Sequence, residues 1–286
     1  MSNTIQPVAP ATHAPSEACA SCNVYRAANL KKLGVNMERC DHVIALAGNP
    51  NTGKSTIFNA LTGLRQHTGN WPGKTVTRAE GAFEYAGKRY KLVDLPGTYS
   101  LLSASQDEEV ARDFILFGQP DCTIVVTDAT ALERNLNLVM QVMEITDKVV
   151  VAINLMDEAK RKGLDVDARS LSRDLGVPAV PITARTGEGI HTLLATVADL
   201  INGEITTKPL RVEGTPEFQK AVHELVPMIE QMAPGIPNAR WLAIRLLDGD
   251  AKVQQALVSG ELAQRVQRQK QADVQFSRKM SVEGRQ

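Results

Sequence analysis

The sequence predicts an α/β fold in which a doubly wound sheet is followed by a smaller helical subdomain. From residue 42 onward, short apolar runs rich in β-branched residues alternate with longer helical patterns. Several of these runs are apolar almost throughout, which is typical of central strands covered by helices on both faces. Beyond about residue 203 the strand patterns stop and only helical patterns continue. A chain of 286 residues is long enough for two such domains.

The predicted elements follow one another in chain order. Strands are expected at Val43–Ala47, Ala79–Tyr85, Arg89–Asp94, Cys122–Thr127, Lys148–Asn154 and Ala179–Ile182. Helices are expected at 54–64, 106–117, 132–146, 167–175 and 189–202. This alternation is the basis for predicting the doubly wound sheet.

A further helix is predicted to start at Thr215-Pro216-Glu217, where a threonine N-cap precedes a proline at the first helical position and an acid in the first turn. Two more helices are expected at 239–247 and 252–268. The predicted domains are a mostly disordered leader with a cysteine cluster at 1–40, the α/β domain at 41–204, a helical regulatory subdomain at 205–272 and a flexible tail at 273–286.

The charge balance and hydropathy narrow the class of protein. Lys and Arg number 32, as do Asp and Glu, so net charge offers no electrostatic case for nucleic acid as a partner. No stretch approaches the roughly 18 consecutive apolar residues of a membrane span, and the start of the chain lacks the features of a signal peptide. We therefore expect this chain to be soluble and to lie in the cytosol.

The four cysteines do not make a disulfide framework in a chain of this size. Cys122 lies in an apolar run and is expected to be buried. Cys19 and Cys22 have the spacing of a metal or redox pair, and Cys40 is the next cysteine, but a structural zinc site needs four ligands. Reduced thiols are the expectation for these three residues, whose role the sequence leaves open.

A complete P-loop follows the first predicted strand and opens the first predicted helix. Its nucleotide-binding residues are Gly48, Asn49, Pro50, Asn51, Thr52, Gly53, Lys54 and Ser55, with Thr56 next in the helix. The backbone N–H groups of such a turn point at phosphate oxygens, and the helix N-terminus adds partial positive charge. Lys54 is expected to reach the β- and γ-phosphates, and Ser55 to ligate Mg²⁺.

Asp94-Leu95-Pro96-Gly97 ends another predicted strand, about forty residues after the P-loop lysine. A carboxylate in this position can bind Mg²⁺ through water, and the Gly97 N–H can contact the γ-phosphate. An isolated Asp-x-x-Gly is weak evidence, because surface turns often match it. Its distance from the P-loop lysine and its place at a strand end make it specific.

Asn154-Leu155-Met156-Asp157 is the predicted base-selecting motif, with Asn154, Met156 and Asp157 as nucleotide-binding residues. The Asp157 carboxylate can accept hydrogen bonds from both N1–H and the exocyclic amine of guanine, a donor pair that adenine lacks. The lysine usual at the second position is Leu155 here, so we expect modest guanine affinity.

Two further segments complete the predicted site. Thr183-Ala184-Arg185 follows the last strand, with the Ala184 N–H expected to face guanine O6. The segment 69–77 is the predicted first switch, which needs a hydroxyl that ligates Mg²⁺ while γ-phosphate is present. Thr75 is the chosen residue, and Thr77 remains the alternative. Trp71 is expected either to anchor this loop or to recognise a partner. These motifs together predict a P-loop GTPase-type fold, with residues 41–204 as a GTP-binding G domain.

With these motifs, the chain resembles the cytosolic G domain of the FeoB family of bacterial ferrous-iron transporters over roughly residues 42–270. The stretches that carry the resemblance are the P-loop, Gly69-Asn70-Trp71-Pro72-Gly73, Asp94-Leu95-Pro96-Gly97-Thr98-Tyr99-Ser100 and Asp128-Ala129-Thr130 with Leu132-Glu133-Arg134-Asn135-Leu136. A helical subdomain after the G domain is also similar to the family.

The resemblance implies a slow GTPase whose switch state passes to a membrane-embedded iron permease region, in cis or in trans, on the cytoplasmic side of the bacterial inner membrane. It also implies potassium activation, with Asn51 and first-switch carbonyl groups as ligands of the ion. A monovalent cation there could neutralise charge that develops on the phosphates. The candidate catalytic residues are thus Asn51, Lys54, Thr75 and Gly97. Self-association into a homo-oligomer remains open.

Two residues depart from the expected pattern. Thr98 stands where many signalling GTPases carry a glutamine, so water must be positioned by backbone, cation or another loop. Lys74 stands where an apolar residue is more usual.

Two alternative functions remain at this point. One is an RNA-linked GTPase in ribosome assembly or tRNA modification, although no added basic RNA-binding domain follows residue 203. The other is a guanine-nucleotide binding module with negligible turnover.

Overall fold

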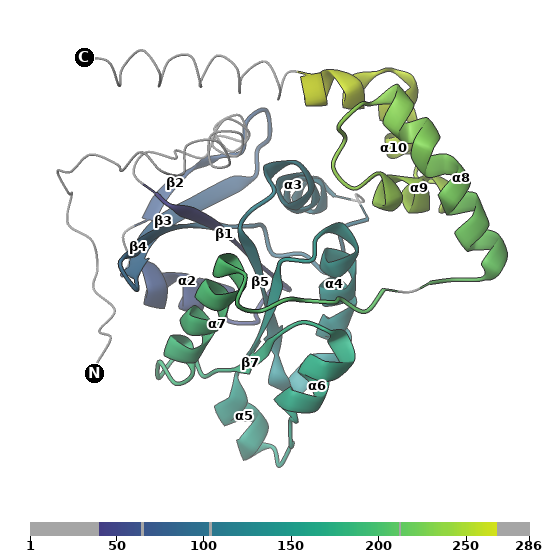
Figure 1. Cartoon of the computed structure of the whole chain (residues 1–286). Coiled ribbons are helices and arrows are strands. Elements are labelled where there is room, and N and C mark those ends of the chain that lie inside the picture. The colour runs from purple at the N-terminus through teal and green to yellow at the C-terminus, as the bar shows by residue number, and fades with distance from the viewer. Residues whose placement is uncertain (1–39, 64–65, 103–104, 212, 268–286) are drawn as a thin grey trace, which may run out of the picture. The chain divides into compact units, whose positions relative to one another are not determined.

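The computed structural model describes residues 40–63, 66–102, 105–211 and 213–267, and they form two compact units that divide between Leu210 and Arg211. Figure 1 traces both units along the chain, and each is described by itself. The connector up to Leu210 belongs to the first unit because its backbone is bonded to it. The Lys208 N–H donates to the Gly176 carbonyl at 2.9 Å, and the Leu210 N–H donates to the Leu175 carbonyl at 2.8 Å.

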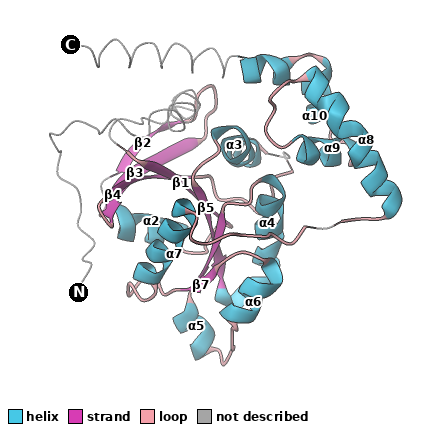
Figure 2. Ribbon diagram, in the orientation of Figure 1, coloured by secondary structure: helices cyan, strands magenta, loops and turns pink. Residues whose placement is uncertain are grey.

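The first unit is built on a seven-stranded sheet of order β2-β3-β4-β1-β5-β6-β7. Figure 2 shows its strands in magenta among the cyan helices. Five strands run parallel, namely β4 (Lys88–Asp94), β1 (His42–Gly48), β5 (Cys122–Asp128), β6 (Val149–Asn154) and β7 (Ala179–Pro181). At the other edge, β2 (Gln66–Asn70) and β3 (Thr77–Tyr85) pair antiparallel to their neighbours. The carboxyl ends of the parallel strands therefore meet at one edge, where ligands of such sheets bind.

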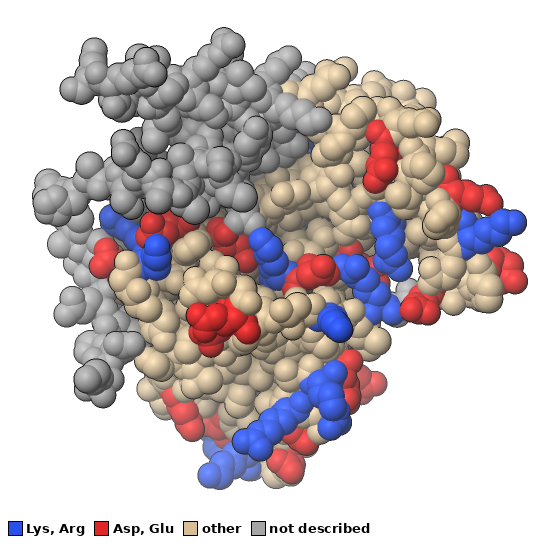
Figure 3. Space-filling view, in the orientation of Figure 1, with Lys and Arg blue, Asp and Glu red and all other residues tan. Residues whose placement is uncertain are grey.

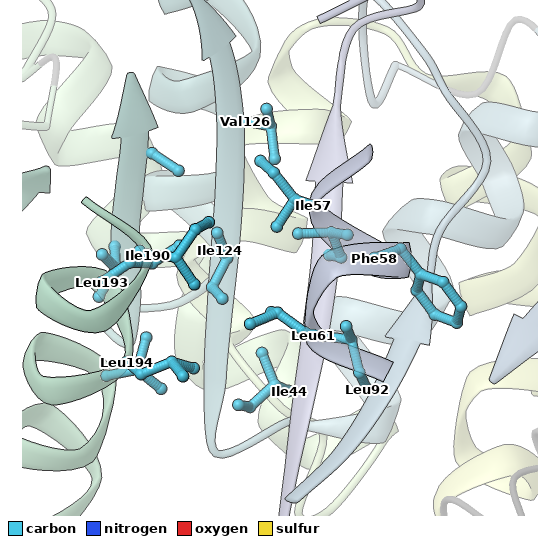
Figure 4. Packing of buried hydrophobic residues seen from close by; sticks show 14 of the residues in the cluster. Ile44, Ile57, Phe58, Leu61, Leu92, Ile124, Val126, Ile190, Leu193 and Leu194 are labelled. Carbon is cyan, nitrogen blue, oxygen red and sulfur yellow. The ribbon is translucent and has the colours of Figure 1, made fainter. Parts of the chain in front are cut away.

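Two helices cover one face of this sheet, α2 (Lys54–Thr62) and α7 (Ile190–Asn202), and α4 (Leu132–Ile145) packs on the other face (Figure 1). The apolar stripe of α2 and that of α7 pack against alternate residues of the central strands, because strand side chains point to the two faces in turn. Figure 4 shows this core, with Ile57, Phe58, Leu61, Ile190, Leu193 and Leu194 of the helices facing Ile44, Leu92, Ile124 and Val126 of the strands.

The remaining helices of the first unit are shorter. α3 spans Gln106–Asp113 and continues into a π-helical turn at Phe114–Gly118, while α5 spans Met156–Arg161 and α6 spans Ala168–Leu175. Side-chain caps fix the starts of two of them. Ser105 accepts a hydrogen bond from the Glu108 N–H, and Asp167 accepts from the N–H groups of Arg169 and Ser170.

The second unit is helical, with α8 (Pro216–Met232), α9 (Ala239–Leu247) and α10 (Ala251–Val258). Thr215 caps α8 by accepting from the Phe218 N–H, and Pro216 occupies the first turn, as the sequence predicts. α8 packs on α9 around Val222, Ile229, Trp241 and Leu242, all buried.

The predicted fold class is confirmed, and three details were not foreseen. The strand β2 and the helix α5 had no predicted counterpart. The helix expected to run unbroken over 252–268 is interrupted after Val258, because Gly260 adopts a left-handed φ of 73° before helix resumes at 261–267. Residues 1–39 and 268–286 lie outside the described residues, so the leader with Cys19 and Cys22 and the tail at 273–286 remain predictions.

Candidate functional site

The P-loop forms the turn between β1 and α2. Asn51 and Gly53 both adopt left-handed backbone conformations, with φ of 65° and 83°. At Gly53 a side chain is excluded by contact as well, since a Cβ there would lie 2.2 Å from Nδ2 of Asn154. The Thr52 hydroxyl, which is buried, donates to the Asn49 carbonyl at 2.9 Å and closes the turn. Ser55 and Thr56 are exposed in the first turn of α2.

Lys54 and Asp94 are paired directly. The Lys54 ammonium donates to Oδ1 of Asp94 and also to the Leu95 carbonyl, at 2.7 Å for the latter. Burial raises the pKa of the Asp94 carboxyl above its ordinary value, and the adjacent Lys54 ammonium offsets part of that rise. The two residues predicted to serve the phosphates and the metal therefore satisfy each other in this structure.

The predicted second switch is the segment 94–101, which begins with the Asp94-Leu95-Pro96-Gly97 motif. It starts where β4 ends, beside the P-loop. The Leu95 N–H donates to the Leu46 carbonyl at 3.0 Å, and the Thr98 N–H donates to the Gly48 carbonyl at 3.3 Å. Gly97 is adjacent to Pro50, since a Cβ built on it would lie 3.6 Å from the Pro50 backbone. The Thr98 hydroxyl donates to the Ser100 carbonyl at 2.7 Å. Thr98 is buried, and this bond engages its hydroxyl within the loop.

Asn154 joins the two ends of the predicted nucleotide site. Its Nδ2 donates to the Thr52 carbonyl in the P-loop at 2.9 Å, and its Oδ1 accepts from the Ala184 N–H at 3.0 Å. The Asn154 side chain is buried, so these two bonds satisfy it where water is scarce. The Asn154 side chain thus connects the base motif, to which it belongs, with the P-loop and with the 183–185 segment.

Asp157 lies in the first turn of α5, after Leu155, whose φ of 63° turns the chain out of β6. Its Oδ2 accepts from Nη2 of Arg185 at 2.9 Å. The Met156 N–H donates to the Ile182 carbonyl at 3.4 Å, which ties the motif to the segment before Thr183. The base motif and the 183–185 segment are thereby adjacent, as the sequence predicts.

The predicted first switch connects β2 to β3 and rests on α3. The Thr75 hydroxyl donates to Oε1 of Gln106 at 3.2 Å, and the Lys74 ammonium lies 2.6 Å from Oε2 of Glu109. Thr75 is exposed, and so is its alternative, Thr77, which begins β3. The structure therefore places Thr75 against α3 and leaves the choice between the two threonines as a prediction.

Trp71 anchors this loop, one of the two roles expected for it. Its ring is buried edge-on against Phe114 of the π-helical turn, with centroids 5.4 Å apart, and the Arg78 guanidinium lies over it. Trp71 Nε1 finds no hydrogen-bond partner within the part of the chain that the structure describes.

Several residues that position the switches carried no recognisable pattern in the sequence. Gln106 and Glu109 lie in the polar first turn of α3, which looks like any other helix start in the sequence. Only Lys74, the partner of Glu109, stands out as unusual. The Arg134 guanidinium lies 4.5 Å from the centroid of the Tyr99 ring, which connects the two stretches typical of the family. Gln141 of α4 accepts from the Leu101 N–H at 2.6 Å. These contacts fasten the second switch to α4.

Comparison with known proteins decides the family. The sequence model of Ferrous iron transport protein B matches residues 42–197, and that of the FeoB cytosolic helical domain matches residues 215–283. The chain belongs to the FeoB family. It contains the N-terminal G domain of that family, a P-loop GTPase domain.

FeoB relatives are similar to this chain in sequence and in structure over most of its length. The Fe(2+) transporter FeoB of Salmonella typhimurium is 40% identical over 227 residues, which is 77% of this chain and 28% of the relative. The solved cytosolic domain of L. pneumophila FeoB is 35% identical, with a TM-score of 0.69 over 82% of this chain and 93% of that one. The GMPPNP form of the T. maritima FeoB cytosolic domain is 33% identical, with a TM-score of 0.70 over 83% of this chain and 98% of that one.

The chain thus spans about 28% of the length of the curated FeoB relatives it matches. No helix among the described residues is long and apolar enough to cross a membrane.

Proposed function

We propose that this chain is a Mg²⁺-dependent GTP-binding and GTP-hydrolysing switch domain that regulates ferrous iron uptake across the bacterial inner membrane. The observation that carries the proposal is the Asn154 bridge between the Thr52 carbonyl and the Ala184 N–H. It sets a phosphate-binding loop and a base-reading segment at a fixed separation, as a nucleoside triphosphate requires.

The phosphates are held by the P-loop in this proposal. Backbone N–H groups of the turn and the N-terminus of α2 supply the partial positive charge, and Lys54 supplies a full one. Lys54 must leave Asp94 to reach the phosphates. At the other end, Asp157 accepts from guanine N1–H and the exocyclic amine, and the Ala184 N–H faces guanine O6.

The residues beside the P-loop suit a magnesium ion. Ser55 offers a hydroxyl oxygen and Asp94 a carboxylate oxygen, and Mg²⁺ prefers such hard oxygen ligands while keeping several waters. Bound there, the ion would neutralise charge on the phosphates. Asp94 is bonded to the Lys54 ammonium in the structure, so its carboxylate would become available to the ion once Lys54 moves to the phosphates.

The switch in this proposal is the loop that carries Thr75. In the structure the Thr75 hydroxyl donates to Gln106 on α3, so the loop has a defined position against that helix. Nucleotide with a γ-phosphate would draw Thr75 to the metal, and hydrolysis would release it. The Gly97 N–H would follow the γ-phosphate in the second switch.

Hydrolysis is proposed to be slow and activated by potassium, with Asn51 as a side-chain ligand of the ion. Asn51 is exposed at the top of the P-loop, and its left-handed backbone turns it out of the helix that follows. The Thr98 hydroxyl donates to the Ser100 carbonyl, which engages it within its own loop. A potassium ion held by Asn51 would add positive charge beside the phosphates to that of Lys54 and Mg²⁺.

We further propose that the domain works at the cytoplasmic face of the membrane beside an iron permease region, in cis or in trans. The relatives named Fe(2+) transporter FeoB are much longer than this chain, which leaves room for that region. Self-association of the chain into a homo-oligomer is also part of this proposal. Figure 3 shows basic and acidic side chains interspersed over the visible face of the described residues, an arrangement that does not favour RNA as the partner.

The test is turnover of GTP by the whole chain with Mg²⁺ and with EDTA. We expect phosphate release that requires Mg²⁺, is lost in Ser55→Ala and is absent with ATP. The exposed residue Ser259, in the helical unit, gives a matched control, because Ser259→Ala should retain the full rate. Tight GTP binding without phosphate release would instead favour the binding module with negligible turnover.

A further inference from the structure

The side chains of Arg185 and Asp157 meet across two loops that follow different strands. Nη2 of Arg185 lies 2.9 Å from Oδ2 of Asp157, and the side chain of Asp157 is 28% exposed while that of Arg185 is 75% exposed. Arg161 also approaches this oxygen, but at 4.0 Å and from the same helix. Arg185 is therefore the cation that donates to the carboxylate expected to read the base.

Recognition of guanine depends on the plane of that carboxylate. Guanine presents N1–H and the exocyclic amine side by side, so both carboxylate oxygens must lie in the plane of the base to accept from them. The torsion that sets this plane in an aspartate is broad and poorly defined by itself. A hydrogen bond from a planar guanidinium to one oxygen restricts the range of that torsion. Each carboxylate oxygen still has a second lone pair with which to accept from the base.

The placement of Arg185 is itself fixed by the base site. Ala184, the preceding residue, donates its N–H to the buried Asn154 side chain at 3.0 Å. The Thr183 carbonyl accepts from the Gly187 N–H at 3.0 Å, which closes the turn on the other side of Arg185. The backbone that carries the guanidinium is thus held by the same asparagine that anchors the P-loop.

Leu155 makes this contact more consequential. The base motif carries leucine where a lysine is usual, so the motif itself supplies no cation beside the base. We propose that Arg185 is a specificity-determining positioning residue, which sets the plane of the Asp157 carboxylate for guanine and supplies the positive charge absent at position 155. The inference rests on the proposed function, because it assumes that Asp157 reads the base.

The experiment compares the affinity of the whole chain for GDP and for IDP, which lacks the exocyclic amine. Arg185→Ala is expected to weaken GDP binding by about two- to fivefold, as is usual for the loss of a partly exposed ion pair. It is expected to change IDP binding much less, so the GDP-to-IDP ratio falls. Arg185→Lys should restore only part of the ratio, because an ammonium lacks the planar fork.

Arg161→Ala is the matched control, since it removes the same charge near the same oxygen at the longer distance. Its GDP-to-IDP ratio should stay at the wild-type value. In an Asp157→Asn background, Arg185→Ala should no longer change the ratio. A simple loss of folding would lower both affinities together and would also appear in the circular dichroism spectrum.

Three outcomes would overturn the inference. Equal weakening of GDP and IDP by Arg185→Ala would show that the arginine acts as a general cation or cover for the base. Tighter GDP binding by that variant would show that Arg185 competes with guanine for Asp157. Absence of GDP binding by the wild-type chain would refute the proposed function, and the inference with it.

Discussion

The ammonium of Lys74 lies 2.6 Å from Oε2 of Glu109, and this ion pair joins the predicted first switch to α3. Both side chains are partly buried, with 31% of Lys74 and 18% of Glu109 exposed. The neighbouring Thr75 hydroxyl donates to Gln106, one turn earlier on the same helix. Two adjacent loop residues thus hold on to α3 together.

Removal of the lysine should favour the nucleotide-bound position of the loop. Because the ion pair stabilises the loop only while it rests on α3, Lys74→Ala is expected to tighten Mg²⁺-dependent GMPPNP binding by about two- to fivefold. GDP affinity should stay unchanged. Titration with fluorescent nucleotide analogues measures both. Lys88→Ala, at an exposed lysine that begins β4, is the control and should leave both affinities as they are. Weaker GMPPNP binding by Lys74→Ala would instead show that the pair supports the active position.

Potassium activation can be assigned to Asn51 with a variant that avoids backbone strain. Asn51 has a φ of 65°, which glycine adopts at no steric cost, so Asn51→Gly removes the side chain alone. We expect the wild-type chain to hydrolyse GTP faster in potassium than in sodium, and the variant to lose most of that difference, on the order of tenfold. GDP affinity should persist. Equal wild-type rates in the two buffers would count against a potassium site.

Base selection should follow the carboxylate of Asp157. Asp157→Asn presents an amide donor where guanine also offers donors, so GTP affinity should fall by roughly tenfold or more. Xanthine carries a carbonyl oxygen in place of the exocyclic amine, and XTP should bind the variant better than GTP. Competition between the two nucleotides at equilibrium measures the shift. An unchanged preference for GTP would mean that another residue reads the base.

The connector between the two units should resist substitution at Gly176. Both Gly176 and Gly163 have φ of +69°, but a Cβ on Gly176 would lie 1.8 Å from the Lys208 carbonyl oxygen, and a Cβ on Gly163 would meet nothing within 4 Å. Gly163→Ala should therefore cost about 1 kcal/mol of unfolding free energy from backbone strain alone. Gly176→Ala should cost about 1–3 kcal/mol more from the steric overlap. Urea unfolding measures the free energy of unfolding of both variants. Equal losses of unfolding free energy would show that the connector moves aside at no measurable cost.

The sequence by itself determined the elements whose patterns are local. The buried run of β1, the amphipathic stripe of α2 and the threonine cap of α8 all follow from residues within a few positions of one another. The P-loop belongs to this class as well, since its glycines and Lys54 are contiguous and lie between a strand and a helix. For the same reason the order and the chemistry of the four nucleotide-binding motifs follow from the sequence alone.

Elements without a local pattern needed the tertiary structure. The described part of β2 is polar and exposed, with no apolar alternation to mark it, and it exists because its backbone pairs with β3. Likewise Gln106 and Glu109 gain a role only because the first switch rests on α3. Nothing in the spacing of Lys74 and Glu109 along the chain indicates that they touch.

The geometry of the site was decided by the order of the strands. Asn154 contacts a residue 102 positions earlier, and Asp157 contacts Arg185, because β6 lies between β5 and β7 with its carboxyl end at the same edge as that of β1. Such contacts are non-local, and their partners are selected by packing of the whole sheet. The motifs therefore indicated which residues would form the site, and the fold decided which of them hold one another.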